Sequence, residues 1–291
     1  MKLARILASF CFLIVIPVYS QTFKEALDLY NQTKHDESLK ILTALPLLDA
    51  EVYNLIAKNQ YMLGDYDRAL EFLQKSLKLE SEILGDVGDN ISDDYLWIGR
   101  AYGKKAESGD PSAIKNAINS RKALEKAVDF QVRNIEALED LFEFYIRAPG
   151  FLGGSKPKAS KIADTIKVLN IAEGHIYYSK LAENYKDFES AERYLTIAIN
   201  TKPDDCNYRL DMAAYLTRRK RYDESKKIFE EANAICSGNP DFLFGKAQVY
   251  INSKRNLGEA RRLLDIYISL DNLTPNNPSR YEARQLLKSL N

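Results

Sequence analysis

The side chains that most often carry out chemistry are few in this sequence and widely spaced. The 291 residues include two histidines, His35 and His175, and three cysteines. Neither histidine has a second histidine or a cysteine at the spacing of a metal site, so we expect both to be surface or packing residues. We predict no metal site and no cofactor.

Three carboxylates lie at helical spacing within the stretch 135–147. Glu136, Glu139 and Glu143 are three and four residues apart, which places them on one face of a helix. Such a stripe could hold a cation or supply an acid and a base. An acidic stripe that is solvated or lines a groove is far commoner, and the sequence pairs no nucleophile with a base. We therefore predict no catalytic residues and a protein that is not an enzyme.

A glycine-rich segment, residues 149–155, follows that stretch. Glycines beside Ser155 and Lys156 at a helix start could hold an anion with backbone N–H groups. The spacing is not that of a P-loop, because Gly150 is followed five residues later by Ser155 and no strand is predicted before it. The alternative is a shaped turn in which Phe151 and Leu152 pack on the helices. We attach no activity to this segment.

Composition excludes one class of partner. The 41 Lys and Arg residues balance the 41 Asp and Glu residues. A protein that neutralises many phosphates normally carries a basic excess or a basic tail, so we expect no nucleic-acid partner. The 45% apolar and 28% charged content is typical of a folded soluble protein. The length allows two or three domains, or one long repeat array.

The N-terminus has the pattern of a secretory signal peptide. Lys2 and Arg5 precede an apolar stretch over 6–18, and small Ser20 suits cleavage after that position. The apolar stretch is shorter than the roughly 20 residues of a membrane span, although a retained anchor is the alternative. No later stretch approaches the length of a membrane helix. We predict a signal peptide over 1–20 and an exported protein, periplasmic or secreted, with no transmembrane segment after its removal.

Export would place the protein in an oxidising compartment. Cys11 lies within the predicted signal peptide, which leaves Cys206 and Cys236. An even pair in such a compartment is more often bridged than free.

The elements that must position all these side chains are helices in a repeating pattern. Residues 52–79 have the apolar periodicity of two amphipathic helices with a turn at Gly64 and Asp65. This stretch resembles the tetratricopeptide repeat (TPR), a helix-turn-helix unit of 34 residues. The repeat has small residues at its eighth, twentieth and twenty-seventh positions, where its helices approach closely. Here these are Ala57, Ala69 and Ser76.

The twentieth position can be followed along the chain. Its residues are Ser38, Ala69, Ser120, Ala159, Ala191, Ser225 and Ala260, which lie 31, 51, 39, 32, 34 and 35 residues apart. The twenty-seventh position follows as Leu45, Ser76, Ala127, Ile166, Ala198, Ala232 and Tyr267. The resemblance implies an all-α, right-handed superhelical solenoid of about seven units over 21–277.

Residues 278–291 are expected to form a capping helix. In the stretch 279–290, Tyr281 and three leucines fall toward one side, while Arg280, Arg284 and Lys288 fall on the other. We expect these three cations to face solvent. The longest departure from the period lies in the third unit, where we expect an extended second helix from about Ser112.

The repeat phase sharpens the cysteine prediction. Counted from Ser225 as position twenty, Cys206 is at position one and Cys236 at position thirty-one of the same unit. Because the helices of such a unit run antiparallel, the start of the first lies beside the end of the second. We predict a Cys206–Cys236 disulfide; two partly buried thiols are the alternative.

The resemblance also implies where function lies. Such arrays usually bind on the concave surface lined by the first helices, at repeat positions two, five, nine, twelve and thirteen. These positions supply Lys58, Tyr61, Arg100, Lys104, Arg147, Lys180, Asn184 and Arg218. They form a candidate basic groove for an acidic peptide, a chain terminus or an anionic envelope polymer. Carboxylates share the face: Glu51, Asp93, Glu136, Glu139, Glu143, Glu173, Glu183 and Asp241. The groove is therefore mixed, and a solvated charged face is the alternative.

One specialised activity of the family is not supported. Members that bind chaperone tails grip a terminal carboxylate with a Lys, Asn and Arg set, whereas Asn54 and Lys58 occur here in the reverse order. We predict a non-catalytic scaffold or adaptor in the cell envelope that binds a segment of a protein partner in its concave groove. The alternative is a binding module for a glycan or peptidoglycan fragment that uses groove aromatics such as Tyr61 and Phe244.

Overall fold

The computed structural model describes residues 20–46, 48–84, 89–109, 111–274 and 277–290. Within these ranges all regular secondary structure is helical. Apart from Ser20, the predicted signal peptide lies outside the described residues. Ser20 belongs to a helical stretch that continues to residue 31.

The helices follow one another as seven pairs and one further helix. The pairs are residues 20–31 with α2 (His35–Thr43), α3 (Ala50–Met62) with α4 (Tyr66–Leu84), α5 (Asp89–Ala106) with α6 (Ala113–Phe130), α7 (Ile135–Arg147) with α8 (Lys156–Leu169), α9 (Ile171–Asn184) with α10 (Phe188–Thr201), α11 (Asn207–Arg218) with α12 (Tyr222–Ile235), and α13 (Pro240–Ser253) with α14 (Leu257–Ser269). The 3-10 turn η1 (Gly150–Leu152) separates α7 from α8, and α15 (Arg280–Lys288) follows the last pair. The predicted all-α solenoid of about seven units with a C-terminal helix is confirmed, and the extended helix of the third unit is α6.

The helix boundaries have local causes. Asp49, Asn134, Asn170 and Asp187 each accept a hydrogen bond from a backbone N–H of the first turn, at the starts of α3, α7, α9 and α10. Such caps satisfy donors that the helix itself leaves free. Gly64 has a φ of +86°, which turns the chain sharply between α3 and α4.

Small residues let the helices of each pair approach closely. Every residue predicted at the twentieth position is buried, with no more than 4% of its surface exposed. Serine hydroxyls among them donate to a backbone carbonyl of the partner helix, as Ser38 does to Ala26 and Ser225 to Ala213, both at 2.8 Å. Their burial therefore leaves no unpaired hydroxyl, and a larger side chain has no room.

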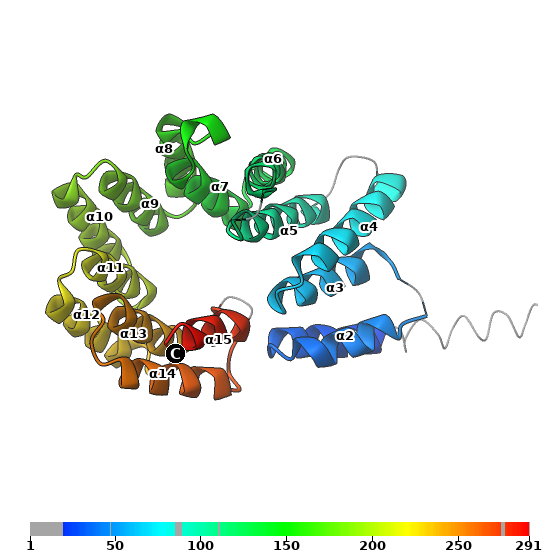
Figure 1. The fold of residues 1–291 in the computed structure, drawn as a ribbon. Helices are drawn as coiled ribbons and strands as arrows, with labels where there is room; N and C mark the ends of the chain where they lie inside the picture. The colour runs from blue at the N-terminus through cyan, green and yellow to red at the C-terminus, as the bar shows by residue number, and fades with distance from the viewer. Residues whose placement is uncertain (1–19, 47, 85–88, 110, 275–276, 291) are drawn as a thin grey trace, which may run out of the picture.

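The pairs are arranged in a ring (Figure 1). From α5 onward, the first helices α5, α7, α9, α11 and α13 lie on its inner side and the second helices lie outside; α3 is the corresponding first helix of the second pair. We call the surface of these first helices the concave face. Helix α15 extends from the last pair toward the first pairs, and Lys104 on α5 is paired with Glu282 on α15 at 3.2 Å.

The orientation of α15 differs from the expectation. Arg280 does not face solvent: its guanidinium donates to the carbonyl oxygens of Ile268, Leu270 and Thr33. The prediction for Arg280 was wrong because both faces of α15 have neighbours, the last helix pair on one side and the first pairs on the other. A helix that only capped the array would have one.

The predicted disulfide is present. Cys206 is the N-cap residue of α11 and Cys236 the C-cap residue of α12, and their sulfurs are bonded with the Cα atoms 6.0 Å apart. The bridge joins the start of α11 to the end of α12, at the end of this helix pair opposite to its connecting turn. In the part of the chain that the structure describes, no helix combines the length and apolar character needed to cross a membrane.

Candidate functional site

The predicted groove cations lie on the concave face, and each is already in an ion pair. The pairs are Lys58 with Asp93 at 2.7 Å, Arg100 with Glu136 at 2.9 Å and Asp140 at 2.6 Å, Lys104 with Glu282 at 3.2 Å, Arg147 with Glu143 at 2.9 Å, Lys180 with Glu143 at 2.8 Å, and Arg218 with Glu183 at 2.8 Å. We call this set the ion-pair ladder. The expected basic groove is therefore not a row of free cations.

The ladder ties neighbouring units together. Lys58 joins α3 to α5, Arg100 joins α5 to α7, and Lys180 joins α9 to α7. Two other predicted groove residues also make structural contacts. Asn184 donates to the carbonyl of Ile146 at 3.1 Å, and Tyr61 meets the Trp97 ring edge-on at 5.1 Å between centroids.

A group of carboxylates on the concave face has no such cation. Glu139 on α7, Glu173 on α9 and Asp211 on α11 form no ion pair with any cation of the described residues. Burial, and then the charge of Glu173, raise the pKa of Glu139 to about 7. Burial raises the pKa of Asp211 to about 6 against the opposing charge of Lys180, and burial also raises the pKa of Glu173. We call these three residues the acidic cluster.

Lys180 is the cation whose charge reaches the whole acidic cluster. It acts on all three carboxylates, while its direct ion pair is with Glu143. Burial favours the neutral form of Glu143, but Lys180 and Arg147 outweigh it and hold the pKa of that carboxyl below its ordinary value. The Lys180 ammonium thus interacts with four acidic side chains, namely Glu139, Glu143, Glu173 and Asp211.

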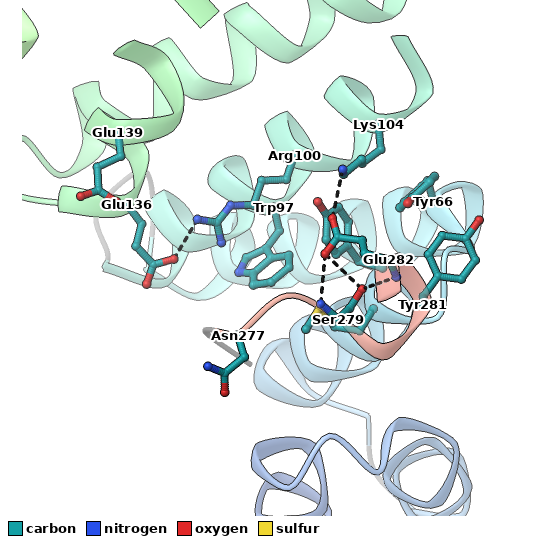
Figure 2. Close-up of a pocket in the computed structure, with 12 residues that line it drawn as sticks. Tyr66, Trp97, Arg100, Lys104, Glu136, Glu139, Asn277, Ser279, Tyr281 and Glu282 are labelled. Atoms are coloured by element: carbon teal, nitrogen blue, oxygen red, sulfur yellow. Dashed lines mark hydrogen bonds and ion pairs between the residues drawn. The ribbon is translucent and has the colours of Figure 1, made fainter. Parts of the chain in front are cut away.

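A cavity of about 450 Å³ lies where the two ends of the ring meet (Figure 2). Aromatic side chains line it, namely Tyr61, Tyr66, Trp97 and Tyr281, together with Arg100, Lys104, Glu136, Glu139 and Glu282. The guanidinium of Arg100 stacks 4.8 Å from the centroid of the Trp97 ring. We call this space the closure cavity.

A second cavity, of about 490 Å³, lies between α5, α6 and α7. Its walls include Leu124, Phe144 and Leu152, and its rim carries Arg147 and Lys104. Leu152 comes from the glycine-rich segment, as expected for a residue packed on the helices. Phe151 does not pack there, since 76% of its surface is exposed.

The glycine-rich segment is a tightly built turn. A Cβ on Gly154 would lie 1.8 Å from the carbonyl oxygen of Ala148, so only glycine fits. Ser155 caps α8 and accepts from the backbone N–H of Lys158. The backbone N–H groups of Gly153, Gly154 and Ser155 also donate to carbonyl oxygens within the turn and at the end of α7, so they are engaged in forming the turn.

A third cavity, of about 580 Å³, lies between α11 and α13 and reaches α15. Asp211, Arg218, Asp241 and Phe244 contribute to its lining. Phe244 packs against Tyr267 with ring centroids 5.3 Å apart and is only 7% exposed. It therefore offers little surface for stacking on a ligand.

The two histidines are packing residues, as expected. His35 is buried, and its Nδ1 lies 3.0 Å from the side-chain oxygen of Asn59. His175 stacks on Tyr194 with ring centroids 5.8 Å apart. Among the described residues, no three His, Cys, Asp or Glu side chains form a group that could hold a metal ion.

One buried acidic site was not predicted from the sequence. Asp94 on α5 is fully buried, and its Oδ1 accepts a hydrogen bond from Asn54 at 2.7 Å. Its Oδ2 has no partner among the described residues, and neither has Oε2 of the nearby buried Glu80. Burial raises the pKa of Asp94 to about 7. Nothing in the sequence separates Asp94 from its less buried neighbour Asp93.

Comparison with known proteins agrees with this architecture. The sequence model of the tetratricopeptide repeat matches residues 50–83, which is the α3 and α4 pair. A crystal structure of a tetratricopeptide repeat protein from Parabacteroides merdae is 12% identical and has a TM-score of 0.57, over 94% of this chain and 98% of that chain. A thermophilic TPR protein of Thermus thermophilus is 16% identical with a TM-score of 0.51, over 71% of this chain and 98% of that chain. No curated protein matches this sequence.

The repeat match and the fold together define the class of protein. Residues 50–83 match the tetratricopeptide repeat, and the fold is that of solved tetratricopeptide repeat proteins, so the resemblance first indicated by the small residues is confirmed. Proteins of this fold generally act as scaffolds for protein–protein interaction rather than as enzymes.

Proposed function

We propose that this protein is a non-catalytic scaffold that binds a cationic segment of a partner protein on its concave face. One observation carries the proposal. Every predicted groove cation is held in the ion-pair ladder, whereas Glu139, Glu173 and Asp211 have no cation of their own among the described residues. The expectation of an acidic partner depended on free cations in the groove. We replace it here with a partner segment that is positively charged.

The raised pKa values of the acidic cluster support a positively charged partner segment. A carboxyl whose pKa lies near 7 is ionised only in part at neutral pH, because burial and neighbouring charges disfavour its anion. A Lys or Arg side chain placed beside Glu139 or Asp211 stabilises that anion and is itself stabilised. Charge complementarity of this kind mainly sets which partner is accepted and how fast it associates.

The test is direct binding of model peptides to the full chain. We would measure fluorescence anisotropy with three labelled peptides of equal length, one rich in Lys, one neutral and one rich in Glu, at low and at high salt. We expect only the Lys-rich peptide to bind, more weakly as salt rises because screening weakens charge attraction. The triple variant Glu139→Gln, Glu173→Gln and Asp211→Asn should lose about tenfold or more in affinity.

A matched variant removes three carboxylates from the outer helices. Asp129 on α6, Glu189 on α10 and Glu231 on α12 are exposed, so Asp129→Asn, Glu189→Gln and Glu231→Gln change the net charge equally. This variant should bind the Lys-rich peptide almost as the wild type does. Equal loss in both variants, or preference for the Glu-rich peptide, contradicts the proposal.

Glycan binding is the second candidate, and the closure cavity is the observation that favours it. Four aromatic side chains and several charged groups line a space of about 450 Å³, and aromatic rings commonly stack on sugar faces. Trp97 is the only tryptophan of the chain, so its intrinsic fluorescence reports on this cavity. Titration with soluble peptidoglycan fragments should change that fluorescence saturably and raise the melting temperature if this candidate holds. No change in either signal excludes it.

We further propose that the protein is exported and that its signal peptide is cleaved after Ser20. The charged start, the short apolar stretch and the Cys206–Cys236 disulfide support this, since disulfides persist in oxidising compartments. N-terminal sequencing of the native protein should give Gln21 as the first residue. A protein that retains residues 1–20 contradicts the cleavage.

A further inference from the structure

The first turn of α15 contacts the start of the array at three points. The Glu282 carboxylate is paired with Lys104 on α5 at 3.2 Å, although the two residues are 178 positions apart. Arg280 donates to the carbonyl of Thr33 at 3.2 Å, across 247 positions. The Tyr281 ring lies against Gly64, in the turn between α3 and α4.

The contact of Tyr281 with Gly64 is possible because glycine has no side chain. A Cβ on Gly64 would lie 2.8 Å from Cζ of Tyr281, which is closer than carbon atoms pack. The positive φ of Gly64 already requires glycine for the turn. The same residue thus allows both the turn and the close approach of the ring.

The start of α15 is held firmly by the last helix pair. Ser279 and Glu282 form a capping box, in which each side chain bonds the other residue's backbone N–H. Arg280 donates to Ile268 and Leu270 at the end of α14 as well as to Thr33. One guanidinium therefore links the last unit of the ring to the first.

We infer that Arg280, Tyr281 and Glu282 form a latch that closes the ring, and that the closed latch occupies the part of the concave face beside Lys104 and Tyr61. Tyr281 and Glu282 line the closure cavity together with Tyr61, Trp97 and Lys104, and Figure 2 shows Glu282 reaching the Lys104 ammonium. The other predicted groove cations take their partners from the first helices. Lys104 is paired with Glu282 of the latch at 3.2 Å and, at the longer distance of 3.6 Å, with Glu107.

The latch makes the region around Lys104 unavailable to another chain. A partner segment that reaches this region has to displace Glu282 from Lys104 and the Tyr281 ring from Gly64. The closure of the ring is independent of the proposed scaffold function, whereas the occupation of a docking surface rests on it. The two parts therefore have separate tests.

The closure is tested by chemistry at the Lys104 and Glu282 contact. A water-soluble carbodiimide joins an ammonium and a carboxylate only when they touch, so mass spectrometry of the treated full chain should find a Lys104–Glu282 amide. The Glu282→Gln variant is the control, because glutamine retains a capping box but cannot be coupled. Absence of the amide in the wild type overturns the latch.

Hydrogen exchange measures the opening. The double variant Tyr281→Ala, Glu282→Gln removes the ring and the charge of the latch but leaves the buried Ala283 of α15 in place. We expect amides of α15 to exchange about tenfold faster in this variant than in the wild type. The matched variant Tyr185→Ala, Glu189→Gln changes two exposed side chains at the α9 to α10 turn and should not alter α15. Equal exchange of α15 in all three proteins also overturns the latch.

The occupied surface is tested with the latch segment supplied as a separate molecule. A labelled peptide with the sequence of residues 278–290 should bind the double variant about tenfold more tightly than the wild type, because only the variant has the surface free. Adding Lys104→Glu to the double variant should abolish that binding. Peptide binding that is equal in wild type and double variant shows that the latch covers no docking surface and overturns this part alone. The Lys-rich peptide assay of the proposed function does not use this contact, so the two failures are distinguishable.

Discussion

The ammonium of Lys180 lies 2.8 Å from the Glu143 carboxylate and 4.5 Å from the centroid of the Tyr177 ring. The charges of Glu139, Glu173 and Asp211 also interact with it. The negative electrostatic potential at the face of the Tyr177 ring attracts the Lys180 ammonium. Lys180 is thus the cation with which all four of these carboxylates on the concave face interact.

Removal of that charge should destabilise the protein in a pH-dependent way. For Lys180→Met we expect a loss of about 1–3 kcal/mol at pH 8, because four carboxylates then lose the one cation that they share, although Glu143 keeps its ion pair with Arg147. The loss should shrink toward pH 5, where Glu139, Glu173 and Asp211, whose pKa values are raised, are increasingly protonated. Urea unfolding at the two pH values measures it. Lys226→Met is the control: Lys226 is exposed and 3.8 Å from Glu230, so its loss should cost less than about 0.5 kcal/mol.

The raised pKa of Asp94 predicts that stability falls as pH rises. Burial lifts this pKa from 3.8 to about 7. Between these values the folded protein binds a proton that the unfolded chain has lost, so stability is greatest below pH 4 for this group and decreases up to pH 7. Asp94→Asn removes this dependence and should raise the free energy of unfolding by about 2 kcal/mol at pH 8, with little change at pH 4. The exposed Asp129→Asn should leave the pH profile unchanged, and a wild-type profile that rises from pH 4 to 7 in parallel with that of Asp94→Asn contradicts the assignment.

The disulfide should contribute a large part of the local stability. Its bridge closes a loop of about 31 residues, which corresponds to about 3–4 kcal/mol in the chain-entropy account. We expect the variant Cys206→Ala, Cys236→Ala to lose about that much in urea unfolding. Reductant should destabilise the wild type and leave the double variant unchanged. An equal effect of reductant on both proteins would mean that the bridge is not the cause.

Glycines in two settings should respond oppositely to alanine. Gly154→Ala places a methyl group 1.8 Å from the Ala148 carbonyl oxygen, so the turn must shift, and we expect a loss of about 2 kcal/mol or more. Gly258 lies in α14 with no neighbouring atom within 4 Å of the added methyl. Gly258→Ala should therefore be neutral or stabilising by up to about 1 kcal/mol, through its helix propensity. Thermal unfolding of the two variants compares them, and a Gly154→Ala protein as stable as the wild type rules out the tight turn.

The elements that could be predicted from the sequence are those set by local pattern. The small residues at Ala69 and Ser225 are buried where the repeat phase places them, and the helix expected over 135–147 is α7. The cysteine pairing also followed, because it depends only on the geometry within one helix pair. Each of these predictions depends only on the sequence and geometry of a single repeat unit.

The parts that could not be predicted depend on how units sit against one another. Repeat position places Lys180 on the concave face, but its pairing with Glu143 depends on the angle between α9 and α7. Closure of the ring depends on the sum of many small rotations from unit to unit, including that of the longer third unit. The contact of Lys104 with Glu282, and with it the inward direction of Arg280, therefore has no local signal.

Closure also changes how such a molecule comes apart. In an open array each unit touches only its neighbours, so a terminal unit can unfold by losing one interface while the rest stays folded. Here the first and last units touch each other through Arg280 and Thr33. Any unit that unfolds loses contacts on two sides, and neither end can fray alone. The latch thus converts a linear array into a cycle, whose unfolding is cooperative over the whole chain rather than progressive from its ends.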